Sequence, residues 1–245
     1  MHTIAFLSDI HANLPALEAV ISNISEFEID EIIVGGDCIG IGPYPAETLE
    51  RIIKLPNVSF INGNHELVAI YGVSKYIELT SSEEQGYLEH AKWCNSQLSQ
   101  HMLSYLKNQP LFLKKVIEGV NCIFIHYPLD KERENSVYPF KDTKLKEEDL
   151  KLVFSEFSEH LVGFGHLHTP YEINNNNQIL LNPGSLGCNN HSVARFAIIQ
   201  FHQEKIQFKI HTVNYDDTEL FNTFEDRDVP DRKFIYKAFF GGRFT

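Results

Sequence analysis

The sequence predicts an α/β fold in which two β-sheets are flanked by helices. The first observation is that short apolar runs with β-propensity alternate, over residues 3–62, with segments whose apolar residues return every three or four positions. The second is a pair of alternating apolar and polar segments at 193–201 and 205–213. The alternation predicts βαβ units with a largely parallel sheet, and the pair predicts an antiparallel hairpin that closes a second sheet.

The expected strands are apolar runs of five residues, and most of them have the composition of buried strands. They are TIAFL (3–7), EIIVG (31–35), VSFIN (58–62), NCIFI (121–125), LVGFG (161–165) and QILLN (178–182). Helices are expected at 14–24 and 45–55, between the first three strands. The four asparagines at 174–177, between YEI and QILL, predict a turn.

Few strand signals and several helical ones occur between Glu66 and about Pro110, the longest at 82–106. We therefore expect one domain over residues 1–245, with a cap-like helical insertion at about 67–110. Because this insertion directly follows GNHE at 63–66, we expect it to line the mouth of the site. Its aromatic side chains would either stack on a nucleobase or pack a small helical core. They are Tyr71, Tyr76, Tyr87 and Trp93.

Composition excludes several classes of protein. The formal charge of −12, without a stripe of lysines and arginines, argues against broad nucleic-acid binding. The four cysteines have no CxxC spacing, so we expect neither a zinc ribbon nor a disulfide framework, and we interpret the cysteines as buried residues. No signal-peptide pattern and no run of 18 apolar residues occurs, so we expect a cytoplasmic protein without a membrane span. A homo-oligomer stays open.

Polar residues that bind metals follow five of the expected strands. They are Asp9 and His11, Asp37, Asn64, His126, and His166 with His168. The carboxyl ends of parallel strands meet at one edge of a sheet, so these side chains should converge. Imidazole and carboxylate ligands suit manganese, iron, zinc or nickel. Seven ligands exceed what a single structural ion would take, so we predict two ions. A carboxylate could bridge two ions that lie about 3.5–4 Å apart, and Asp37 is the best candidate for it.

The ordered motifs resemble those of the calcineurin-like metallophosphoesterase superfamily, specifically its small bacterial and archaeal phosphodiesterase branch. They are DIH at 9–11, GD at 36–37, GNHE at 63–66, a lone histidine at 126 and GHLH at 165–168. The resemblance covers residues 3 to about 201 and implies a two-sheet β-sandwich flanked by helices, the αββα fold of that superfamily.

The resemblance also implies a role for each residue of the site. One ion would be held by Asp9, His11 and His168, the other by Asn64, His126 and His166, with Asp37 between them. His65 would be the catalytic histidine that does not bind metal. The implied cofactors are two divalent ions, manganese or iron, with zinc and nickel as alternatives. The implied reaction is hydrolysis of a phosphodiester or similar ester, on a small-molecule or nucleotide-like substrate, by a water that bridges the ions.

Two positions depart from the pattern of the superfamily. Gly40 stands where a second carboxylate often orients the catalytic histidine, and Glu66 is the nearest replacement in the sequence. His126 is followed by Tyr127 and Pro128 instead of GSP, from which we expect a bulkier segment and a different substrate mouth. The NPGSLG segment at 182–187 also resembles the superfamily, and we expect it to shape a loop.

Other functions stay open at this point. A protein phosphatase and a dinucleoside polyphosphate hydrolase would use the same chemistry. The alternative that is not an enzyme is an interaction scaffold, since a eukaryotic branch of this fold serves as a retromer subunit. That branch lacks the catalytic histidine, whereas His65 is present here, so the sequence favours the enzyme. No substrate-binding residue is predicted.

Overall fold

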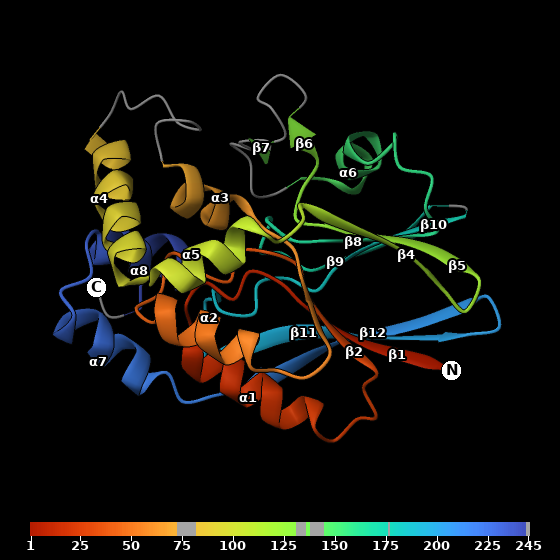
Figure 1. Cartoon of the computed structure of the whole chain (residues 1–245), viewed down its shortest axis with the longest axis horizontal. Coiled ribbons are helices and arrows are strands. Elements are labelled where there is room, and N and C mark those ends of the chain that lie inside the picture. Colours follow the sequence, from red (N-terminus) through yellow and green to blue (C-terminus); the bar gives the residue numbers. More distant parts are fainter. Residues whose placement is uncertain (73–81, 131–135, 138–144, 176, 244–245) are drawn as a thin grey trace.

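Two five-stranded sheets stack face to face, with helices over their outer faces (Figure 1). The structure is a computed structural model that describes residues 1–72, 82–130, 136–137, 145–175 and 177–243. The predicted α/β architecture of two sheets flanked by helices is confirmed. None of the helices in these ranges combines the length and the apolar character that crossing a membrane requires.

The first sheet has the strand order β12-β11-β1-β2-β3. Its strands are β1 (His2–Leu7), β2 (Glu31–Val34), β3 (Val58–Phe60), β11 (Val193–His202) and β12 (Lys205–Asn214). As predicted, β1, β2 and β3 are parallel and are linked by α1 (Leu14–Ile24) and α2 (Pro45–Ile53). Both helices begin with a proline in the first turn, where its missing N–H is tolerated.

The hairpin of β11 and β12 was predicted correctly, but the sheet to which it was assigned was wrong. β11 pairs antiparallel with β1, with Ala197 opposite Phe6, so the hairpin extends the first sheet. The reason is the burial of β11 on both faces: Phe196 packs towards the helices, whereas Ile199 packs between the sheets. In this position the two faces of β11 pack on the helices and on the second sheet. Its two edges pair with β1 and β12.

The second sheet has the order β4-β5-β8-β10-β9. Its strands are β4 (Phe112–Ile117), β5 (Val120–Ile125), β8 (Leu161–Phe164), β9 (Tyr171–Asn175) and β10 (Gln178–Asn182). The edge strand β4 was not predicted, because its two central lysines interrupt the apolar run. The outer face is covered by α6 (Glu147–Val153), and a separate short pair is formed by β6 (Leu129–Asp130) and β7 (Ser136–Val137).

The core between the sheets is built from alternate residues of the strands. On β1, Ile4 and Phe6 face the second sheet, whereas Ala5 and Leu7 face the helices, and all four are fully buried. Phe6 meets Phe124 of β5 edge to face, at 5.2 Å between ring centroids. The two sheets are thereby held so that the loops after β1, β2, β3, β5 and β8 open at one end.

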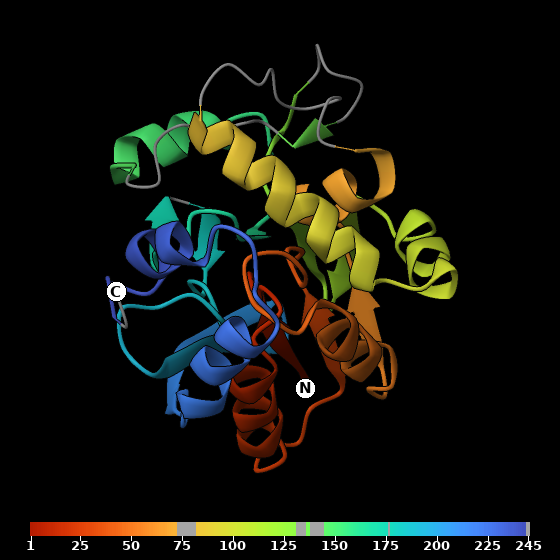
Figure 2. The same cartoon turned by 90° about the vertical axis from the view of Figure 1, so that its left-hand side faces the viewer.

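Helices cover that end of the sandwich. Between β3 and β4 lie α3 (Asn64–Tyr71), α4 (Ser82–Gln97) and α5 (Gln100–Lys107), and α4 crosses the end where the loops open (Figure 2). The helix predicted at 82–106 is interrupted because the Ser99 hydroxyl accepts a hydrogen bond from Met102 N, which caps a new helix. The unpredicted helices α7 (Thr218–Asp226) and α8 (Arg232–Phe239) share an aromatic cluster with Tyr44.

Of the aromatic residues considered for substrate stacking, Trp93 packs in the core between helices, and Tyr71 is exposed. Tyr87 lies beside His65, with ring centroids 6.2 Å apart. Tyr76 lies outside the described residues.

Candidate metal centre

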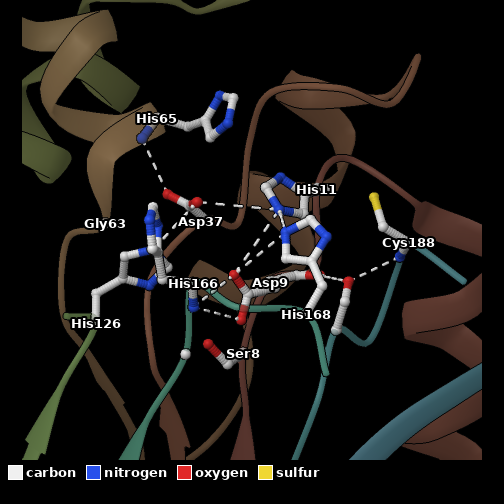
Figure 3. Close-up of polar contacts among 12 residues, drawn as sticks. Ser8, Asp9, His11, Asp37, Gly63, His65, His126, His166, His168 and Cys188 are labelled. Atoms are coloured by element: carbon white, nitrogen blue, oxygen red, sulfur yellow. Dashed lines mark hydrogen bonds and ion pairs between the residues drawn. The ribbon is translucent and has the colours of Figure 1, made fainter. Parts of the chain in front are cut away.

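All seven predicted metal ligands lie together at the open end of the sandwich (Figure 3). Five of them have left-handed backbone conformations, with φ between 50° and 69°. They are Asp9, His11, Asp37, His166 and His168. Each such conformation costs about 1–3 kcal/mol for a residue other than glycine, and strain of this kind gathers at functional sites. The fold therefore tolerates local strain in order to aim these side chains inward.

One half of the cluster consists of Asp9, His11 and His168. The Nε2 atoms of His11 and His168 face each other at 2.8 Å. Asp9 Oδ1 lies 3.8 Å from His11 Nε2 and 3.6 Å from His168 Nε2. The backbone N–H of His166 donates to both oxygens of the Asp9 carboxylate, which fixes its orientation.

The other half consists of Asn64, His126 and His166. Asn64 Oδ1 lies 2.9 Å from His166 Nδ1 and 3.2 Å from His126 Nε2. His126 Nδ1 lies 2.8 Å from the carbonyl oxygen of Gly35, which can only accept a hydrogen bond. His126 therefore carries a proton on Nδ1 and directs Nε2 into the cluster, an arrangement that is usual for histidines that bind metals.

Asp37 lies between the two halves. Its Oδ2 is 3.1 Å from His126 Nε2 in one half and 3.9 Å from His11 Nε2 in the other. Its Oδ1 accepts a hydrogen bond from the backbone N–H of His65 at 2.9 Å. Two groups of donor atoms, each within 4.8 Å of one another, share this residue: His11, Asp37 and His65, and Asp37, His126 and His166. A carboxylate in this position can contact two cations at once.

The charges of the cluster favour cations. Asp9 and Asp37 are buried, and in the described part of the chain both form ion-pair contacts with histidines only. Burial raises the pKa of Asp9 to about 7. Burial alone would lower the pKa of His126, but the interaction with the Asp37 carboxylate has a larger opposite effect and raises the pKa to about 10. Protons thus balance the buried carboxylates when no metal is bound, and cations would replace them.

The remaining histidines are suited to donate lone pairs. Burial lowers the pKa of His166 to about 3 and that of His168 to about 4, and it lowers the pKa of His11 as well. Neutral imidazoles are the form that binds metals. His11 Nδ1 is buried without a hydrogen-bond partner among the described residues. The donor set and its charge therefore fit divalent metal ions, and the structure brings together the seven residues named from the sequence.

The sequence model of the calcineurin-like phosphoesterase superfamily domain matches residues 2–204. The chain belongs to this superfamily. It is 27% identical to an uncharacterized protein of Methanocaldococcus jannaschii, over 93% of this chain and 94% of that protein.

Two solved structures resemble the chain over nearly its whole length. A hypothetical protein from Pyrococcus horikoshii OT3 has a TM-score of 0.79 at 20% identity and covers 99% of both chains. A metallophosphoesterase from Sphaerobacter thermophilus has a TM-score of 0.68 at 24% identity, over 94% of this chain and 95% of that one. At these identities the two structures support the fold alone.

The first departure from the superfamily pattern, Gly40, makes room for the imidazole of His65. A Cβ atom on Gly40 would lie 2.2 Å from His65 Nδ1, and Gly40 has φ of +80°. The ring packs edge to face against His11 at 5.1 Å, and no described carboxylate pairs with it. Packing against Gly40, His11 and Tyr87 therefore holds the His65 ring.

His65 itself points its ring away from Asp37, although its backbone N–H faces that carboxylate (Figure 3). One ring nitrogen still lies within 4.8 Å of donor atoms of His11 and Asp37. Burial lowers the pKa of the ring. The ring of His65 therefore borders the half of the cluster that contains His11.

Glu66, the nearest candidate by sequence for orienting His65, binds backbone groups instead. Its buried carboxylate accepts four backbone N–H groups, from Asp37, Cys38, Ile39 and Gly63, at 2.8–3.1 Å. Glu66 is the third residue of α3, so its side chain reaches back to the residue before the helix and also grips the loop after β2. Burial raises its pKa, and the backbone donors oppose that rise.

Replacing Glu66 by Gln should therefore destabilise the protein and weaken metal binding. The amide keeps one acceptor oxygen but points an NH₂ group at backbone donors, and we expect a loss of about 2–4 kcal/mol in the free energy of unfolding. Chemical denaturation and a metal titration measure the two effects. Glu50→Gln, at an exposed pair with Lys54, is the control and should change stability by less than about 0.5 kcal/mol. Equal stability of the two variants would contradict the role of Glu66.

The second departure, Tyr127, is not among the residues that line the cavity of the site. Its side chain is fully buried, packs in the core with Phe154, and has its ring 4.9 Å from that of His166. The aromatic ring therefore turns into the core, and whether the mouth differs from that of other members stays a prediction.

The NPGSLG segment supports the first half of the cluster. Ser185 Oγ donates to the carbonyl oxygen of Asp9 at 2.7 Å, and Gly187 N donates to the same oxygen. The segment then places Cys188, whose Sγ lies within 4.8 Å of donor atoms of His11 and His168. No sequence pattern indicates this proximity, because Cys188 has no second cysteine at CxxC spacing. Burial raises the pKa of its thiol well above the usual value.

A cavity of about 530 Å³ opens onto the cluster. Asp37, Asn64 and His65 line it on one side, and residues from the C-terminal part of the chain complete it. Among these is Phe239 of α8, whose ring lies 5.8 Å from that of His168. The match to the superfamily ends at residue 204, so α8 adds a wall from outside the matched region.

Proposed function

We propose that this protein is a phosphodiesterase that works with two divalent metal ions. One ion would be held by Asp9, His11 and His168, the other by Asn64, His126 and His166, with Asp37 shared. The observation that carries the proposal is the position of the Asp37 carboxylate between two groups of ligands: its Oδ2 lies 3.1 Å from His126 Nε2 and 3.9 Å from His11 Nε2. A single ion would leave one of these groups without a cation.

Imidazole nitrogens with carboxylate and amide oxygens favour manganese or iron, with zinc and nickel as alternatives. When bound, such ions supply positive charge for the phosphoryl oxygens and lower the pKa of water. That charge is needed, because the chain carries a net charge of −12 and the carboxylates of the site would otherwise repel a phosphate.

The residues of the chain would hold the metal ligands in place and act on the leaving group. The hydrogen bonds to Asp9 and His126 hold the ligands in place before substrate arrives, so little reorganisation accompanies the reaction. His65 lines the cavity and would protonate the departing oxygen or stabilise the charge that develops on it. Its packing against Gly40 and Tyr87 limits the positions that the ring can take.

The cavity supports a small or nucleotide-like substrate. Its volume of about 530 Å³ is within the range of pockets for small molecules. A dinucleoside polyphosphate fits the same argument, whereas the wall formed by α8 disfavours a folded phosphoprotein. An interaction scaffold would have no need of His65 in a cavity beside the metal ligands.

The experiment is a turnover screen of the protein after treatment with a chelator and reloading with manganese, iron, zinc or nickel. Bis(4-nitrophenyl) phosphate, dinucleotides, phosphomonoesters and dinucleoside polyphosphates form the panel. We expect diester hydrolysis that is lost on chelation and restored by metal. A protein that holds metal but hydrolyses nothing in this panel would favour the scaffold.

A further inference from the structure

Arg195 is an arginine that lines the cavity opening onto the metal ligands. In β11, its neighbours at alternate positions, Ala197 and Ile199, pack between the two sheets, so Arg195 lies on the same face. Ala197 pairs with Phe6 near the end of β1, and Arg195 lies two residues further towards the loop that carries Asp9. The guanidinium therefore stands where the inner core of the sandwich gives way to the site.

Among the residues that the structure describes, Arg195 lacks the carboxylate partner that the other arginines have. Among the arginines in the described ranges, four form ion pairs with carboxylates: Arg51 with Glu18, Arg227 with Glu47, Arg232 with Glu225 and Asp228, and Arg243 with Asp217. Arg195 makes no ion pair with a described carboxylate, although the chain has an excess of twelve negative charges. A half-buried cation without a carboxylate partner is costly unless a ligand supplies the negative charge.

The position of the guanidinium is fixed by Asn189, which is itself buried. Arg195 Nη1 donates to Asn189 Oδ1, and Asn189 Nδ2 donates to the carbonyl oxygens of Ser185 and Val193, both at 2.9 Å. Ser185 in turn bonds the Asp9 carbonyl. The arginine is thus anchored to the same loop that supports the metal ligands. Its guanidinium has five N–H donors, of which this contact uses one.

We propose that Arg195 forms an anion-binding subsite beside the metal centre and that the substrate carries a second negatively charged group, such as a further phosphate. The planar fork of arginine matches the oxygens of a phosphate, and such a pair is charge-assisted. This inference rests on the proposed function, because it concerns which phosphodiesters the site prefers.

The test compares two substrates that share one scissile diester, thymidylyl-thymidine (TpT) and its 5′-phosphorylated form (pTpT). We expect the manganese-loaded protein to favour pTpT in kcat/KM by about 10- to 100-fold. Arg195→Met should bring this ratio close to one, and Arg195→Lys should keep part of it. Arg51→Met, at a surface ion pair on α2, is the matched control and should keep the ratio of the wild type. Thermal melts check the fold of each variant.

Three results would overturn the subsite. They are a wild type without preference for pTpT, a preference that survives Arg195→Met, and an Arg195→Met variant that loses kcat/KM equally on TpT and pTpT. Calorimetric binding of the two dinucleotides to the same proteins separates this inference from the proposed function. If neither is hydrolysed but pTpT binds more tightly and the gain depends on Arg195, the subsite stands and the phosphodiesterase proposal fails. If both dinucleotides are hydrolysed and the preference does not depend on Arg195, the phosphodiesterase proposal stands and the subsite fails.

Discussion

Replacing Asp37 by Asn is expected to reduce bound metal to fewer than one ion per chain and to lower turnover by at least about 10³-fold. The carboxylate lies between the two groups of ligands and approaches donors in both. An amide keeps the acceptor for the backbone N–H of His65 but loses the negative charge shared by the two ions. Without that charge the cations repel each other, so neither is held well.

Asp9→Asn is the matched control for this variant, since Asp9 is equally buried but belongs to one half of the cluster. We expect it to weaken one ion more than the other. Elemental analysis after dialysis against low concentrations of manganese measures both variants, and circular dichroism in chelator checks their fold. If Asp37→Asn still binds two ions with nearly normal affinity, Asp37 does not bridge them.

His65→Ala should keep the metals and lose activity. None of the seven proposed ligands is altered by this change, and the Asp37 carboxylate keeps its hydrogen bond, because the backbone of residue 65 makes it. Turnover should fall by about 10²- to 10⁴-fold, the range for removal of one positioned acid or base. Burial lowers the pKa of His65 in the free protein, and a bound phosphoryl anion would raise it again, so the ring can carry a proton when it is needed.

The loss should depend on the leaving group. An alkoxide needs a proton as it departs, whereas 4-nitrophenolate is stable without one, so His65→Ala should harm dinucleotides more than bis(4-nitrophenyl) phosphate. Tyr87→Phe, which keeps the ring that packs against His65, is the control for altered packing. A His65 variant that loses metal would make His65 a ligand, and one that keeps both metal and full rate would remove it from the mechanism.

The sequence predicted the fold well where a single strong pattern decided it. The parallel strands β1, β2 and β3 and the hairpin of β11 and β12 have clear apolar periods, and both were found. The sheet that the hairpin joins could not be predicted, because the pairing of Phe6 with Ala197 links residues nearly two hundred positions apart. The edge strand β4 and the helices α7 and α8 have weaker patterns and depend on tertiary packing.

The candidate site was predictable because its residues directly follow strands and form ordered motifs. What the sequence did not show are residues that act through distant partners. The hydrogen-bond partners of Glu66 could not be predicted, because its four backbone donors come together only when α3 meets the loop after β2. Arg195 belongs to no sequence motif. Its proposed role in anion binding follows from its place in the cavity and from the lack of an ion pair with a described carboxylate.

The proposed mechanism requires that the fold hold two metal ions in one cluster. Elemental analysis of the wild-type protein measures this stoichiometry, after the protein is stripped with chelator, reloaded with excess manganese or iron and freed of loosely bound metal. We predict close to two ions per chain, whichever of the two metals is used. A stoichiometry that stays at one with manganese, iron, zinc and nickel would contradict the shared role of Asp37 and, with it, the proposed mechanism.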